Sequence, residues 1–329
     1  MQTVNGTSTS SQRQGGTVDG HAAQKKKFVV FTATGDQGRS VCKYLLEDGG
    51  WDVVGITRNA SSDSAKDLDK MGVKIIQGDM NDPSSYSECL QGAYGAFVNA
   101  DFWQPYFASG CNATIGQETE IKQAKGAIDE CIKAGLKHVV YSTLEDLGED
   151  GIPHLDSKAQ VSKYIKTTSL PTTHLITSYY FSNANKFGQI TKDKHGSFIL
   201  GTPAPDDCYL PGFAVEQTGA WVLKALKDPE RFIGQDIYAC SDILTVSEMA
   251  SILSDVAEVK FNTLGITKEE FYSEQFKAQN DKELWLNLDL FYRKLLKRDV
   301  AKSKELVPEQ WTFRDWAEQN HEFKKIAGI

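Results

Sequence analysis

The sequence lacks a long hydrophobic run, and it has no excess of positive charge. Its longest apolar runs, such as the one that starts at Phe28, are as long as a strand and well short of the roughly 20 residues of a membrane-spanning helix. Lys and Arg number 36 against 44 Asp and Glu, which gives a net charge of −8. Nucleic acids and anionic membranes are bound mainly through positive charge. We therefore expect no membrane segment and no direct contact with nucleic acid.

Cysteine and histidine also lack any regular arrangement. The six cysteines include no Cys-x-x-Cys pair, and no two of the six histidines are four residues apart. These patterns predict neither a disulfide framework nor a metal site. The N-terminal segment has no apolar core of the kind found in signal peptides. We expect a cytoplasmic protein, or a nuclear one if its role is regulatory.

The chain divides into three parts by composition and pattern. Residues 1–24 are rich in Ser, Thr, Gln and Gly and have no aromatic residue, which predicts a disordered tail. Within residues 25–170, strand-like and helix-like segments alternate, which is typical of a doubly wound parallel sheet of the α/β class. Residues 171–329 lose this alternation. We interpret them as a smaller, mostly helical substrate lobe that returns one or more strands to the sheet.

A glycine loop follows the first strand and opens the first helix. Gly35 and Gly38 stand where backbone N–H groups would face a pyrophosphate at a helix N-terminus. This position predicts a Rossmann-type nucleotide site, although an ordinary strand-to-helix turn would also use two glycines. Thr32 occupies the place of the first glycine of the pattern. We expect this branched residue to shift the loop or to weaken binding.

The end of the second strand distinguishes between cofactors. NAD-binding sites place a carboxylate there to bind the ribose hydroxyls, but this strand ends in Thr57-Arg58-Asn59. A guanidinium can bind a 2′-phosphate through two hydrogen bonds. Arg58 therefore predicts NADP(H), unless it is a surface arginine without a ligand.

Several segments taken together resemble the NmrA-like family of atypical short-chain dehydrogenases, which is related to the isoflavone and pinoresinol reductases. The segments are FTATGDQGRSV, VVGITRNAS, VKIIQGDMNDP, QETEIKQAKGAIDECIKAG, KHVVYSTLE and HLDSKAQVSKYI, in that order. The resemblance covers roughly residues 26–325. It implies NADP(H) binding, and it implies a cofactor site formed by Thr34, Gly35, Asp36, Gln37, Gly38, Arg58, Asp79, Met80, Asn99, Ala100, Asp101, Ser142 and Lys158.

The proton donor is the least clear part of this interpretation. No Tyr-x-x-x-Lys, the usual acid of short-chain dehydrogenases, occurs in the chain. The resemblance places Lys158 beside the nicotinamide, where a lysine can act as an acid if neighbouring groups tune its pKa. We expect Asp156 or His154 to assist it, and Ser142, Thr143, Tyr179 or Tyr180 to contribute. A solvated helix lysine and a structural histidine are the alternatives.

An aromatic segment between Asp101 and Gln117 is longer than the connection expected at that place. Its rings suit a flat, apolar substrate above the nicotinamide, with Thr143 and Tyr180 nearby. The same rings could instead anchor the segment. We expect substrate contacts from Phe102, Trp103, Tyr106 and Phe107.

Three functions fit these features. The favoured one is an NADP(H)-dependent oxidoreductase of secondary metabolism that reduces a carbonyl or imine, or that rearranges or cyclises its substrate without net redox change. The second is a non-catalytic NADP(H) sensor that binds protein partners. The third is a scaffold that has lost the cofactor. The missing Tyr-x-x-x-Lys favours the sensor, whereas Lys158 and the aromatic segment favour the enzyme.

Overall fold

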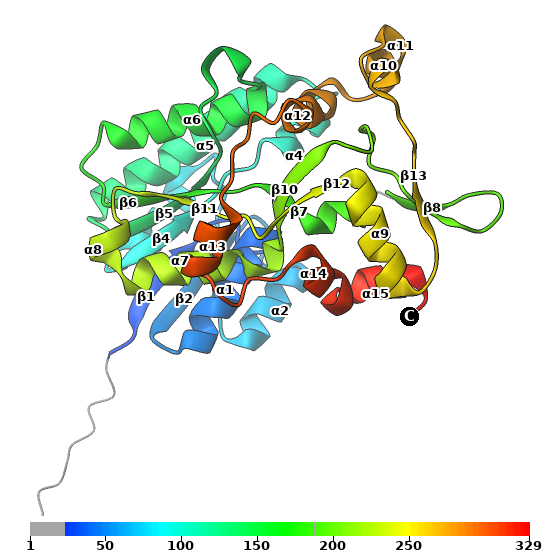
Figure 1. Ribbon diagram of the computed structural model, residues 1–329. Coiled ribbons are helices and arrows are strands. Elements are labelled where there is room, and N and C mark those ends of the chain that lie inside the picture. Colours follow the sequence, from blue (N-terminus) through cyan, green and yellow to red (C-terminus); the bar gives the residue numbers. More distant parts are fainter. Residues whose placement is uncertain (1–23, 187–188) are drawn as a thin grey trace, which may run out of the picture.

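The computed structural model describes residues 24–186 and 189–329, so the predicted N-terminal tail lies almost wholly outside the described residues. A sheet of seven parallel strands lies between two layers of helices (Figure 1), in the order β11-β6-β5-β4-β1-β2-β3. The predicted doubly wound sheet is confirmed. Its strands are β1 (Lys26–Val30), β2 (Trp51–Thr57), β3 (Lys74–Gln77), β4 (Gly95–Val98), β5 (His138–Thr143), β6 (Thr172–Ile176) and β11 (Asp236–Tyr238).

Helices cover both faces of this sheet, because each turns an apolar side towards the buried strands. One face carries α1 (Asp36–Asp48), α2 (Asp63–Met71), α7 (Thr218–Lys227) and α8 (Pro229–Phe232). The other carries α3 (Ser87–Leu90), α5 (Ala113–Lys133) and α6 (Pro153–Lys166). Gly49 and Gly72 end α1 and α2 in the left-handed conformation, which glycine adopts without strain.

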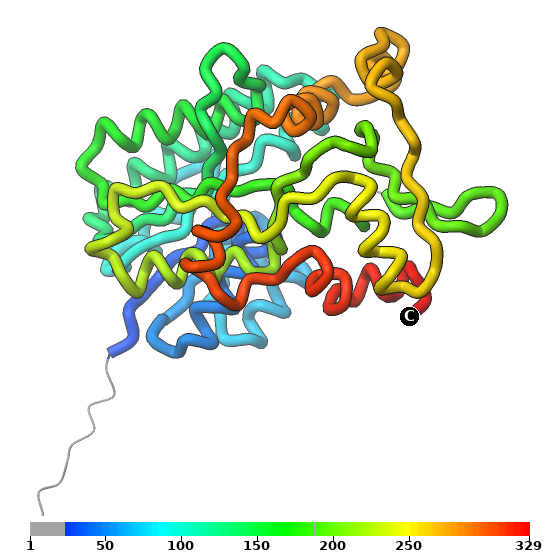
Figure 2. Tube along the Cα trace, viewed as in Figure 1, coloured from blue at the N-terminus to red at the C-terminus, as the bar shows by residue number. Residues whose placement is uncertain are grey.

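The second half of the chain returns to the sheet before it completes the lobe. Strand β11 pairs with β6 at the edge of the sheet, and Figure 2 traces the chain from the green β6 to this yellow-green strand. Beyond the sheet lie two three-stranded sheets with β7 (Tyr179–Tyr180), β8 (Ile190–Lys192), β9 (Phe198–Leu200), β10 (Tyr209–Phe213), β12 (Asp242–Thr245) and β13 (Phe261–Thr263).

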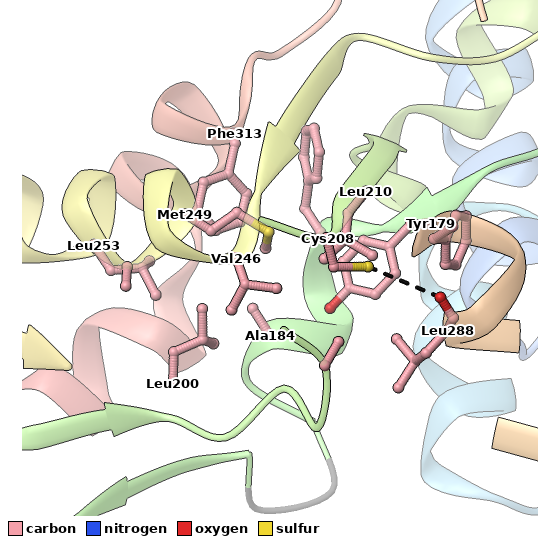
Figure 3. Close-up of a cluster of buried hydrophobic side chains, with 14 of the residues drawn as sticks. Tyr179, Ala184, Leu200, Cys208, Leu210, Val246, Met249, Leu253, Leu288 and Phe313 are labelled. Atoms are coloured by element: carbon pink, nitrogen blue, oxygen red, sulfur yellow. Dashed lines mark hydrogen bonds between the residues drawn. The ribbon is translucent and has the colours of Figure 1, made fainter. Parts of the chain in front are cut away.

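The rest of this part is mostly helical, and it has its own apolar core. Tyr179, Cys208 and Leu288 share this core with residues of α9 (Val246–Ala257) and α14 (Phe313–Gln319), and the Cys208 thiol donates to the Leu288 carbonyl at 3.8 Å (Figure 3). None of the described helices is long and apolar enough to cross a membrane. The remaining helices are α4 (Trp103–Ala108), α9 (Val246–Ala257), α10 (Lys268–Phe271), α11 (Glu274–Gln279), α12 (Lys282–Tyr292), α13 (Val300–Leu306), α14 (Phe313–Gln319) and α15 (His321–Ala327).

Candidate active site

The loop between β1 and α1 turns at a residue that is not glycine. Thr32 has a φ of 49°, in the left-handed region, which costs a residue with a side chain about 1–2 kcal/mol. Its carbonyl accepts the Gly35 N–H at 2.9 Å. A Cβ at Gly38 would lie only 2.4 Å from the same oxygen. Thr32 therefore adopts a conformation that suits glycine, so the tight turn is kept and Gly38 is required for it.

The N-terminus of α1 follows this turn and has no side-chain cap. Gly35 is the N-cap residue and offers no acceptor to the first-turn N–H groups, so these amides can bind an anion. Asp36, in the same turn, is exposed and forms an ion pair with Lys186 from the second half of the chain. The backbone thus fits a pyrophosphate, and a lysine that the sequence analysis missed lies at the same place.

Gln37 links the loop to two other predicted site residues. Its Oε1 accepts a hydrogen bond from Ser142 at 2.8 Å, and its Nε2 donates to the Tyr180 hydroxyl at 2.6 Å. Burial raises the pKa of Tyr180 to about 12. The Gln37 side chain is itself buried. Its side chain therefore joins α1 to the ends of β5 and β7, which leaves its backbone for any phosphate contact.

Arg58 lies exposed at the end of β2 and contacts the aromatic segment. Its Nη1 donates to Oε1 of Gln104 in α4 at 3.1 Å. Thr34 and Thr57 are joined by their hydroxyls at 3.2 Å beside it. Because Arg58 is exposed and bound to one neutral partner, it remains accessible to an anionic group.

The end of β3 supplies the next pair of predicted residues. Met80 is buried, whereas Asp79 is exposed and accepts two hydrogen bonds from Asn81, at 2.9 and 3.0 Å. An apolar surface beside a capped carboxylate is compatible with an adenine ring.

Lys158 is the centre of a largely buried polar cluster. Its ammonium donates to Asn99 Oδ1 at 3.2 Å and to the Ala100 carbonyl at 3.1 Å, both at the end of β4. Glu120 of α5, whose side chain is fully buried, lies 2.8 Å from the same nitrogen. The other oxygen of Glu120 accepts from Ser157. The lysine is therefore fixed against β4, and its partner is Glu120 rather than Asp156.

One helical turn before Lys158, His154 forms a second buried pair. Its ring Nδ1 lies 2.8 Å from Glu283 Oε1, and its backbone N–H donates to the same oxygen at 2.9 Å. Both side chains are more than nine-tenths buried. The Trp103 ring lies 5.0 Å from the imidazole, centroid to centroid. Glu283 comes from α12, so this pair joins the sheet domain to the C-terminal part.

The aromatic segment is helical where a loop was expected, and its four rings have two kinds of environment. Asp101 Oδ1 accepts the Trp103 N–H at 3.0 Å and helps to start α4. Phe102 and Tyr106 are buried, and the Tyr106 hydroxyl donates to Asp281. Trp103 is half-buried and stacks on the exposed Phe107 at 5.8 Å. Phe102 and Tyr106 thus act as anchors, and only Trp103 and Phe107 remain accessible to a substrate.

Three other predicted residues form no hydrogen bond with the Lys158 ammonium among the described residues. Tyr179 is buried in the apolar core of Figure 3, and this burial raises the pKa of its hydroxyl. The Asp156 carboxyl packs against Gly151, and partial burial raises its pKa. Thr143 shares a hydrogen bond of 2.8 Å with Ser162 and lines a separate cavity of about 230 Å³ that reaches β11. The structure gives neither Tyr179 nor Asp156 a contact with Lys158.

Four residues of this arrangement were not predicted from the sequence. They are the partners of predicted residues, and they lie far from them in the chain: Glu120, Glu283, Gln104 and Lys186. For Glu120, the sequence offers one signal, an acidic residue in the helix that precedes β5. For Glu283 it offers none, because this residue is 129 positions from His154.

Comparison with known proteins agrees with the fold. The NmrA-like family profile matches residues 24–316. The NmrA-like family domain-containing oxidoreductase cpsB of Aspergillus campestris is 34% identical over 241 residues, which are 67% of this chain and 70% of that protein.

Solved structures show the same fold. The negative transcriptional regulator NmrA in complex with NADP has a TM-score of 0.75 at 20% identity, covering 93% of this chain and 98% of its own. Triphenylmethane reductase of Citrobacter sp., complexed with NADP(H), has a TM-score of 0.69 at 18% identity, covering 91% and 99%.

The chain therefore belongs to the NmrA-like family, which confirms the resemblance seen in the sequence. Its relatives named as oxidoreductases support the enzyme over the regulator, and the expected NADP(H) agrees with the two structural neighbours.

Proposed function

We propose that the protein is an NADP(H)-dependent oxidoreductase that reduces a carbonyl or imine group of a flat, apolar small molecule, in the cytoplasm and in secondary metabolism. The observation that carries this proposal is that Lys158 of α6 is fixed against the end of β4, and that the next helix after β4 in the chain, α4, keeps the Trp103 and Phe107 rings accessible. In open α/β sheets, ligands bind outside the carboxyl ends of the strands. Lys158, Asn99 and Trp103 all belong to elements at that edge.

NADPH, when bound, supplies a hydride, and the chain has groups suited to hold each part of it. The uncapped N-terminus of α1 would bind the pyrophosphate, and Arg58 the 2′-phosphate. Asp79 and Met80 would border the adenine. Asn99 and Ala100 would lie under the nicotinamide ribose, with Lys158 holding this strand end in place.

Substrate would contact the accessible side of α4. Trp103 and Phe107 stack on each other and offer an apolar surface about as wide as two rings. Tyr180 would approach from the other side of the loop, where Gln37 orients its hydroxyl. A flat molecule suits this surface better than a highly charged one.

A second candidate function is an NADP(H) sensor that acts through protein partners. It is favoured by the likeness to the regulator NmrA, and by the engagement of the Lys158 ammonium with protein acceptors. The two candidates share the cofactor and differ in whether substrate turns over.

The cofactor assignment is tested by measuring the affinities of NADPH and NADH for the wild type and for Arg58→Ala. Loss of a charge-assisted pair should weaken NADPH binding by about tenfold to a hundredfold and leave NADH unchanged. Arg231→Ala, which removes an exposed arginine on α8, serves as the matched control. Equal effects on both cofactors, or no binding, would refute the assignment.

Turnover separates the two candidates. The wild type should oxidise NADPH in the presence of 2-naphthaldehyde, 1,4-naphthoquinone or 3,4-dihydroisoquinoline, which carry carbonyl or imine groups on flat rings. A sensor would oxidise NADPH with none of them, and it would capture protein partners differently with and without NADP⁺.

A further inference from the structure

The proton donor of the proposed reduction has no obvious candidate among the tyrosines. The Tyr180 hydroxyl is already bound to Gln37, and burial raises its pKa to about 12. Tyr179 lies in an apolar core. Neither side chain would release a proton readily near neutral pH.

Lys158 is also a poor donor in the observed arrangement. Two of its N–H groups are directed at Asn99 and Ala100, and the Glu120 carboxylate is in contact with the ammonium. A substrate oxygen would have to displace one of these acceptors. Lys158 is therefore better placed to hold the end of β4 than to transfer a proton.

His154 lies one turn from Lys158 on the same side of α6, since residues four apart are neighbours on a helix. Glu283 faces its Nδ1 at 2.8 Å and also accepts its backbone N–H, which fixes both the ring and the helix end. The carboxylate accepts a hydrogen bond from the Nδ1–H group, which leaves Nε2 for another partner. Among the described residues, none forms a hydrogen bond with Nε2.

The surroundings of the imidazole connect it to the substrate surface. The Trp103 ring lies 5.0 Å from the imidazole and the Phe102 ring 5.9 Å, centroid to centroid. The histidine is therefore covered by the start of α4, the helix that also offers aromatic rings to a ligand. The charged groups around it are Glu283 from α12 and, on its own helix, Asp156 and Lys158. Imidazole is the side chain that exchanges a proton near neutral pH.

We propose that His154, oriented by Glu283, is the proton donor of this reaction and that Lys158 is a positioning residue. This inference rests on the proposed function. The carbonyl carbon accepts the hydride supplied by NADPH, and the carbonyl oxygen takes the proton from Nε2 of the imidazolium. The substrate gains two electrons, NADP⁺ remains, and water returns a proton to His154.

Single-turnover oxidation of NADPH with 2-naphthaldehyde tests this assignment. His154→Asn keeps a donor for Glu283 but has no acid, and it should slow the reaction by about a hundredfold. If His154 is the acid, we expect the wild-type rate to fall as the pH rises and this fall to be absent in the variant. NADPH affinity should stay unchanged. Glu283→Gln should give a smaller loss, and His321→Asn, on an exposed histidine, should give none.

A His154→Asn variant with the wild-type rate and pH profile would overturn the inference while the proposed function stands. A second readout does not need turnover. The ¹⁵N signal of His154 Nε2, assigned by comparison with His154→Asn, should shift when 2-naphthalenemethanol is added to the NADP⁺ complex. If the wild type reduces none of the probes, the proposed function fails. An unshifted Nε2 signal would then overturn the role of His154, and a shifted one would support it as a ligand contact.

Discussion

Two buried pairs of a basic side chain and a carboxylate lie one turn apart on α6, and they differ in which parts of the molecule they join. Lys158 and Glu120 both belong to helices that cover one face of the sheet. His154 meets Glu283, which comes from α12 in the C-terminal part. The first pair is therefore fixed as soon as the sheet and its helices form. The second exists only when the C-terminal part is docked.

This difference suggests a division of roles. A group that holds the cofactor strand should be independent of the substrate lobe, and Lys158 meets that requirement. A group that acts on the substrate should be positioned by the C-terminal part, which we propose forms part of the substrate site. His154 meets this requirement because its partner Glu283 lies in α12. The following variants test this comparison.

The largest effect is expected from Glu120→Ala. Glu120 is fully buried, and its removal leaves Lys158 and Ser157 without their partner. Breaking a buried pair in this way should lower the free energy of unfolding by about 4 kcal/mol. Chemical denaturation measures the change, and Glu118→Ala, on an exposed position of the same helix, should change it little. Equal, small losses in both variants would show that the pair contributes little to the fold.

Glu283→Ala should cost about 3 kcal/mol, because two hydrogen bonds to a buried carboxylate are lost. We expect this loss to be local to the contact between α6 and α12. Hydrogen exchange should rise in α12 and at the start of α6 and stay unchanged in β4. Increased exchange in β4 would contradict the separation of the two pairs.

A buried histidine of the seven-stranded sheet should also account for part of the loss of stability at acidic pH. Burial lowers the pKa of His138 on β5 to about 4, whereas an unfolded histidine titrates near 6.5. Between these values the unfolded state binds more protons, so stability falls as the pH falls. His138 should contribute a loss of about 2 kcal/mol between pH 7 and pH 5.

Denaturation of His138→Gln at both pH values measures this contribution as a difference, which removes the cost of the substitution itself. The variant should lose less stability on acidification than the wild type. An unchanged pH dependence would mean that other groups account for the acid sensitivity.

The smallest effect concerns the phosphate loop. Thr32→Gly removes the left-handed strain of a branched residue and should raise the free energy of unfolding by about 1 kcal/mol. The Thr32 hydroxyl also donates to the Asn99 carbonyl at 3.3 Å, which offsets part of the gain. A lower thermal stability would show that this hydrogen bond outweighs the strain.

The sequence was informative where function depends on local geometry. The glycine N-cap of α1 at Gly35, the exposed Arg58 and the parallel sheet all follow from local patterns, because strands and helix caps are local features. Lys158 could be singled out by resemblance, but its partner Glu120 could not.

Pairs such as His154 with Glu283 depend on how distant segments pack, and no local pattern encodes that packing. The aromatic segment shows the same limit. Its composition predicted a surface for a substrate, yet packing against α5 and Asp281 buries Phe102 and Tyr106 and leaves only two rings accessible.

The central claim, that the protein transfers hydride, is tested most directly with NADPH deuterated at the transferable position of the nicotinamide C4. With an aromatic aldehyde or imine acceptor, we predict that NMR finds the deuterium on the former carbonyl or imine carbon of the product. Tight NADPH binding without deuterium in any product would contradict the claim and would favour a sensor.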